Sequence, residues 1–168
     1  GSNEIGYDFA HDIVRQVAYQ QISPPRRQLI HLQIAQALSA IAQSQPNLMG
    51  DVVYHASLGG NHQLTASAAV MAAEHSLRLF AYTEAIELTQ CGIQHCQQLL
   101  DPPLRIQLHL QLLRTYVKAG ISRNDVSQVT SEIEHLMKEA VAFGLTDEEV
   151  IGLEALINLN YDCGNLHW

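Results

Sequence analysis

Apolar residues recur at every third or fourth position along most of the chain, which is the period of an α-helix with one buried face. The stripe formed by Ile30, Ile34, Leu38 and Ile41 is typical of this pattern. Proline, glycine and asparagine interrupt the pattern at short intervals, where helices end and begin. The sequence therefore predicts an all-α fold, with helices at about residues 11–22, 24–44, 48–58, 62–80, 82–100, 102–120 and 122–143 and from 146 onward. Residues 5–9 alternate between apolar and polar and fit one short strand, for which the rest of the sequence offers no partner.

Two of the predicted helices carry faces that indicate how they pack. Ala66, Ala69 and Ala73 place small side chains on one face, so this helix can approach a neighbour closely. The helix at 102–120 is apolar on two faces. One face comprises Ile106, Leu110, Leu113 and Val117, and the other comprises Leu108, Leu112 and Tyr116. A helix with two apolar faces is expected to lie between neighbours.

Short turns between consecutive helices are typical of stacked antiparallel helical hairpins, so we examined the chain for repeats. The segment at 69–97 resembles a tetratricopeptide (TPR) repeat in its Ala69, Ala73, Tyr82 and Ala85. It departs from that family at Gly92, where an alanine is usual, and its spacing exceeds the roughly 34 residues of the standard repeat. The resemblance implies a TPR-like α-solenoid over residues 46–168, truncated at the C-terminus, whose stacked hairpins act by binding.

Composition and charge exclude several classes of function. Hydrophobic residues make up 47% of the chain, which is too apolar for a disordered segment. Nine basic residues against 17 acidic ones give a net charge of -8, which disfavours direct contact with nucleic acid. No apolar run is long enough to span a membrane, and no secretion signal is present. The odd number of cysteines argues against a disulfide framework, and we expect a cytoplasmic protein.

No complete catalytic or metal-binding motif occurs in the sequence, so we expect no enzyme activity. The chain has neither a Gly-x-Ser-x-Gly nucleophile elbow nor a phosphate-binding loop. Cys91, His95 and Cys96 invite a zinc hypothesis, but Cys96 points about 100° away from the other two, toward the predicted core. We therefore expect no metal site and no cofactor, and a histidine-dependent metal protein is only the third hypothesis. Seven other histidines are scattered through the chain without a two-histidine motif, and most are expected to be solvated or structural: His31, His55, His62, His75, His109, His135 and His167.

The N-terminal third carries a second resemblance, which involves several motifs. They are Tyr7-Asp8-Phe9-Ala10-His11-Asp12-Ile13-Val14-Arg15, Ala18-Tyr19, Ser23, Arg26-Arg27, His31 and Ile34-Ala35. Together these resemble the end of the regulatory ATPase module in STAND-type signalling proteins, where a winged-helix domain leads into helical repeats. The resemblance implies that residues 3–45 form the end of a winged-helix-like segment and its linking helices. Gly1 and Ser2 are interpreted as a cloning scar, and Arg26 and Arg27 are expected to pair with carboxylates or face solvent.

His11 and Asp12 resemble the His-Asp pair of that superfamily, in which the histidine contacts the phosphate of bound ADP. The resemblance implies a nucleotide-sensing role for this pair. The role requires an ATPase domain upstream, because this chain has no phosphate-binding loop. The alternative is that both residues simply cap the first helix.

Two functions follow from these features. The first is a non-catalytic regulatory and interaction arm of a larger signal-transducing ATPase or transcriptional regulator. It would bind a partner protein, an inducer, or its own ATPase or output domain. The second is a freestanding TPR-like adaptor that binds a peptide in a concave groove. Neither function involves nucleic acid or a membrane.

Overall fold

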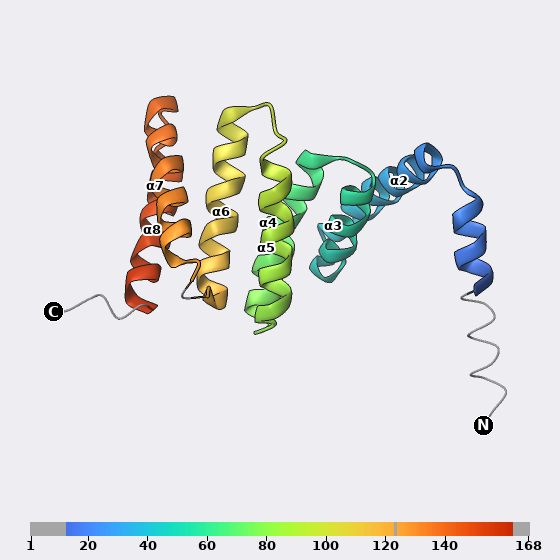
Figure 1. Cartoon of the computed structure of the whole chain (residues 1–168), viewed down its shortest axis with the longest axis horizontal. Helices are drawn as coiled ribbons and strands as arrows, with labels where there is room; N and C mark the ends of the chain where they lie inside the picture. Colours follow the sequence, from blue (N-terminus) through green and yellow to red (C-terminus); the bar gives the residue numbers. More distant parts are fainter. Residues whose placement is uncertain (1–12, 123, 163–168) are drawn as a thin grey trace, which may run out of the picture.

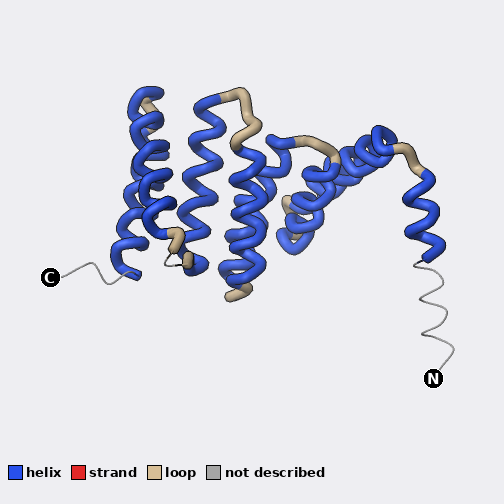
Figure 2. The backbone as a smooth tube through the Cα atoms, viewed as in Figure 1, coloured by secondary structure: helices blue, strands red, loops and turns tan. Residues whose placement is uncertain are grey.

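The computed structural model describes residues 13–122 and 124–162, and the described part of the chain is helical with short connections and no strand (Figures 1 and 2). The all-α prediction is confirmed for this part. A helical segment at residues 13–21 is followed by α2 (Pro24–Ala42), η1 (Pro46–Leu48), α3 (Met49–Leu58), α4 (His62–Arg78), α5 (Tyr82–Cys96), α6 (Pro102–Gly120), α7 (Val126–Phe143) and α8 (Thr146–Asp162). The strand considered at residues 5–9 lies outside the described residues.

The helix boundaries use the residues that local chemistry favours. Gly60, with a φ of 71°, follows α3, and the side chain of Asn61 then accepts a hydrogen bond of 3.0 Å from the backbone N–H of Leu64. Asp101 caps α6 in the same manner, through the N–H of Leu104. Gly144 adopts the left-handed conformation after α7, as the sequence predicts. The largest differences from the expected boundaries are the end of α5, at Cys96, and the start of α7, at Val126.

The core lies between consecutive helices and between alternate ones. Each helix from α2 to α8 packs on the next, while α4 also packs on α6, and α6 on α8. The small residues Ala66, Ala69 and Ala73 are fully buried, which confirms the predicted close approach of α4 to its neighbours. Helices α4 to α8 lie side by side with their axes nearly aligned, whereas α2 is inclined to them (Figure 1).

Helix α6 joins two apolar clusters, as its two apolar faces predict. Leu108 and Leu112 pack with residues of α3 and α4, whereas Ile106 and Leu110 pack with residues of α7 and α8. Tyr116, assigned from the sequence to the face of Leu108, instead belongs to the cluster of α7 and α8. Its hydroxyl donates to Asp125, just before α7, at 3.2 Å, and this bond draws the ring toward α7.

Helix α2 packs along α3, so its contacts cross the domain boundary predicted at residues 45 and 46. This packing buries Ala35 on α2 and Val52 on α3. The winged-helix character of residues 3–45 stays a prediction.

Gly92 marks the closest approach of three helices. A Cβ atom at this position of α5 would lie 2.8 Å from Ala69 Cβ on α4 and 2.8 Å from Leu112 Cδ1 on α6. Both neighbours are fully buried, so they cannot shift readily to make room for the added atom. The glycine that departs from the TPR pattern is therefore required by the packing here.

We expect Gly92→Ala to destabilise the protein by roughly 1–3 kcal/mol, because the overpacking outweighs the gain in helix propensity. The matched control is Gly50→Ala in α3, where nothing lies within 4 Å of the added Cβ. The control is expected to leave stability unchanged or raise it by up to about 1 kcal/mol. Urea denaturation followed by circular dichroism measures both. Equal stability of the two variants would contradict the close approach at Gly92.

Candidate functional site

The three residues considered for a zinc site do not form a set of metal ligands in the described part of the chain. Cys96 is fully buried in the core, where burial raises the pKa of its thiol to about 12. Cys91 is half-buried on another side of α5, and burial also raises the pKa of its thiol. A thiolate is the form that binds metal, and burial disfavours this form in both cysteines. Among the described residues, no three histidine, cysteine or carboxylate side chains gather closely enough to hold a metal ion. His11 and Asp12 lie outside the described residues, and their nucleotide-sensing role stays a prediction.

Four histidines that looked scattered in the sequence form two pairs in the structure. His62, at the start of α4, and His95, in the last turn of α5, have their Nδ1 atoms 2.9 Å apart. His31 on α2 and His55 on α3 have theirs 2.8 Å apart. At these distances one ring of each pair donates an N–H and the other accepts it, so both rings cannot be protonated together without repulsion. The sequence analysis did not anticipate these two pairs.

The pair of His31 and His55 belongs to a larger aromatic cluster. Nε2 of His31 lies 2.9 Å from the hydroxyl of Tyr19, which comes from the helical segment preceding α2. The ring of Tyr54 stands edge-on to both histidines. The guanidinium of Arg27 lies 4.9 Å from the centre of the Tyr19 ring, so Arg27 makes a cation–π contact that the sequence analysis did not anticipate.

Burial, and next the neighbouring His55, lower the pKa of His31. The pKa of His95 is lowered in the same way, first by burial and then by His62. A histidine with a depressed pKa in the folded state binds its proton more readily when unfolded. Each pair therefore contributes stability that is present above the unfolded pKa of about 6.5 and is lost as the pH falls below it.

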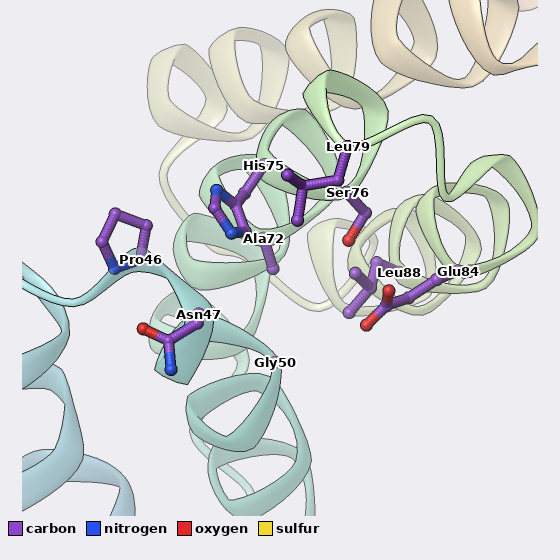
Figure 3. A pocket seen from close by; sticks show the side chains of 9 residues that line it. All are labelled: Pro46, Asn47, Gly50, Ala72, His75, Ser76, Leu79, Glu84 and Leu88. Carbon is purple, nitrogen blue, oxygen red and sulfur yellow. The ribbon is translucent and has the colours of Figure 1, made fainter.

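A groove of about 540 Å³ lies between α3 and α5. Its lining from α3 and the turn before it is Asn47, Gly50, Asp51, Val53, Tyr54, Ser57 and Leu58, and its lining from α5 is Glu84, Glu87, Leu88 and Cys91. A smaller cavity of about 150 Å³ adjoins it and shares Asn47, Gly50, Glu84 and Leu88. The smaller cavity is completed by Pro46 and by residues near the end of α4, which Figure 3 shows surrounding it. The groove and the adjoining cavity together are called the cleft.

Two further cavities lie elsewhere along the row of helices. One of about 320 Å³ lies between α5 and α7, over Leu113 and Tyr116 of α6. Another of about 490 Å³ lies beside His62, between the start of α4 and the segment that joins α5 to α6. The grooves between α3 and α5 and between α5 and α7 thus occupy equivalent positions along the chain.

Charged side chains join the alternate helices away from the cleft. Arg114 of α6 donates to Glu74 of α4 at 2.8 Å, and lies 3.6 Å from Glu154 of α8. Lys118 also pairs with Glu154, and this hydrogen bond is the largest cause of the lowered pKa of that carboxyl. On the other side of α6, Arg105 makes a two-oxygen contact with Glu139 of α7. These basic residues are engaged in holding helices together.

None of the described helices is long and apolar enough to cross a membrane. No family model, curated protein or solved structure matches this chain.

We expect His55→Gln to raise the pKa of His31, because glutamine keeps a hydrogen-bonding side chain beside His31 but cannot become charged. Burial remains, so the pKa should stay below the 6.5 of an ordinary histidine. The measurement is the titration of the histidine Cε1–H resonances by NMR, with the urea-unfolded protein as reference. His95→Gln, in the other pair, is the control that should leave the pKa of His31 unchanged. A wild-type pKa for His31 at or above the unfolded value would refute the paired geometry.

Proposed function

We propose that this chain is the non-catalytic, TPR-like helical-repeat arm of a larger signal-transducing ATPase or transcriptional regulator, and that it binds a segment of protein. The segment belongs either to a partner or to the ATPase or output domain of the same polypeptide. The arm functions in the cytoplasm and makes no direct contact with nucleic acid, in keeping with its net charge of -8.

The observation that carries this proposal is the cleft between α3 and α5. It is open, and both of its walls are helices, which present rigid rows of side chains to an extended or helical ligand. Its exposed lining includes Tyr54 and Leu58, whose side chains are 60% and 44% exposed. Large apolar side chains left exposed in a groove are typical of protein-binding surfaces.

The packing of alternate helices supports the repeat architecture. Helix α6 packs on α4 and α8 packs on α6, while α5 and α7 are the intervening second helices. This is the order expected for a solenoid of stacked antiparallel hairpins, in which each unit contacts only its neighbours. The ion pairs of Arg114 with Glu74 and Glu154 connect three successive units in the same register. The N-terminal motifs that resemble STAND proteins support the assignment to a larger ATPase.

Site-specific photo-crosslinking in the source cells tests this function. We expect a photoreactive phenylalanine analogue in place of Tyr54, within the full natural polypeptide, to form a covalent adduct with a protein segment. The control position is Val141 on α7, which is 61% exposed and lies outside the four cavities described above. Mass spectrometry of the crosslinked peptides identifies the segment.

The origin of the crosslinked peptide separates the two functions derived from the sequence. The regulatory arm is supported if the crosslinked peptide comes from an ATPase or output domain. It is also supported if the peptide comes from a partner protein and the natural polypeptide itself carries such a domain. A peptide from another protein, with no ATPase domain in the chain itself, supports the freestanding adaptor. No protein adduct at Tyr54 above the level at Val141 would argue against both.

A further inference from the structure

The cleft between α3 and α5 has acidic walls at one end. Asp51 on α3 and Glu84 and Glu87 on α5 line it, and no lysine or arginine does. In the described part of the chain, no ion pair within 4 Å joins these three carboxylates to a basic side chain, whereas Glu74, Glu139 and Glu154 are all paired. A carboxylate near a helix N-terminus interacts favourably with the helix dipole, which accounts for Asp51 at the start of α3 and, separately, for Glu84 at the start of α5. The dipole does not explain why they converge with Glu87 on one groove.

The other end of the cleft is apolar. Tyr54 and Leu58 lie one turn apart on α3, and Leu88 and Cys91 continue the wall of α5 beyond Glu84 and Glu87. Gly50, near the start of α3, and Glu84, near the start of α5, both line the smaller cavity, so the first turns of the two helices meet there. The cleft therefore changes from acidic near the starts of both helices to apolar near Leu58 and Cys91.

Gly50 lies on the lining that the groove and the smaller cavity share, where its lack of a side chain leaves an opening. A Cβ added at this position would have nothing within 4 Å. The smaller cavity, at about 150 Å³, has the volume of a space that holds one benzene-sized group. Its walls combine the apolar Ala72, Leu79 and Leu88 with the polar Asn47, His75, Ser76 and Glu84, and its volume admits one side chain of leucine or phenylalanine size.

We propose that the cleft between α3 and α5 binds a basic amphipathic helix from a protein. Its apolar face lies against Tyr54, Leu58 and Leu88, and one apolar side chain passes Gly50 into the smaller cavity. Its lysines or arginines lie against Asp51, Glu84 and Glu87. This inference rests on the proposed protein-binding function and specifies the chemistry of the ligand. Phosphate-bearing ligands do not fit, because the same three carboxylates would repel them.

The test is fluorescence anisotropy with a labelled amphipathic peptide of about 15 residues, built from leucine at i, i+3, i+4 and i+7 and lysine elsewhere. A peptide with glutamate in place of lysine is the matched probe. We expect the lysine peptide to bind, with an affinity that falls as salt is added, and the glutamate peptide to bind at least about tenfold more weakly.

Substitutions at Gly50 test whether the peptide binds in the cleft, because they change the shape of the cleft without changing the charge of the protein. Gly50→Leu fills the opening and is expected to weaken binding of the lysine peptide about tenfold or more, because it blocks the anchoring side chain. Gly50→Ala is the control and should change affinity by no more than about twofold. Gly50→Ala should melt at or above the wild-type temperature, since the added Cβ enters open space and glycine is a poor helix residue. The melting temperature of Gly50→Leu is measured beside it to show that the fold is retained.

A second variant, Glu84→Gln/Glu87→Gln, removes two charges without changing the shape of the groove. It should weaken the lysine peptide and abolish most of the salt dependence. Equal affinity of Gly50→Leu and Gly50→Ala would overturn the inference, because the peptide would then be attracted by net charge alone. If the peptides fail while Tyr54 still crosslinks to a protein in cells, the ligand chemistry is wrong and the protein-binding function stands. If both fail, the function itself is wrong.

Discussion

The contact that the rest of the structure depends on is the meeting of α4, α5 and α6 at Gly92. Three backbones converge there because the facing positions carry almost no side chain: Gly92 on α5 and Ala69 on α4, with Leu112 of α6 filling what remains. Small residues at this point let the helices pack closely without voids. This packing stabilises the fold because every atom has a partner at van der Waals distance. With α4 and α5 held this tightly, α5 becomes a fixed wall, and the position of α3 against α4 then sets the width of the cleft.

Helix α6 transmits this arrangement to the C-terminal half. One of its apolar faces closes the core of α3 and α4, and the other forms the core of α7 and α8. The ion pairs of Arg114 and Lys118 lie between α4, α6 and α8, where they are partly exposed. Partly exposed pairs contribute little to stability, so their consequence is mainly to fix the register of neighbouring helices, while burial of apolar surface supplies the stability.

The sequence predicted most of the helices because capping and breaking residues act locally. The side chains of Asn61 and Asp101 cap the starts of α4 and α6. Gly144 ends α7 in the left-handed conformation, which a residue without a side chain adopts easily. The histidine pairs were missed because they depend on register between helices. One signal was available: in an antiparallel pair joined by a short turn, a residue at the start of α4 meets one at the end of α5, which places His62 beside His95. His31 and His55 gave no such signal, because η1 lengthens the connection between their helices. The cleft was also beyond sequence reasoning, since it arises from the spacing of α3 and α5, which are not consecutive.

The cleft and the histidine cluster are parts of one assembly because they share Tyr54. This side chain lines the groove, while its ring stands edge-on to His55 at 5.1 Å and to His31 at 6.2 Å between centres. His31 belongs to α2 and is bonded in turn to Tyr19 of the preceding segment. The position of Tyr54 in the groove is therefore supported by the ring of His31 on α2 and, through it, by the ring of Tyr19 in residues 13–21. It follows that α2 and residues 13–21 belong to the same packed unit as α3 and α5. Their packing, which crosses the boundary expected from the sequence, orients the exposed aromatic ring that a ligand in the cleft would contact.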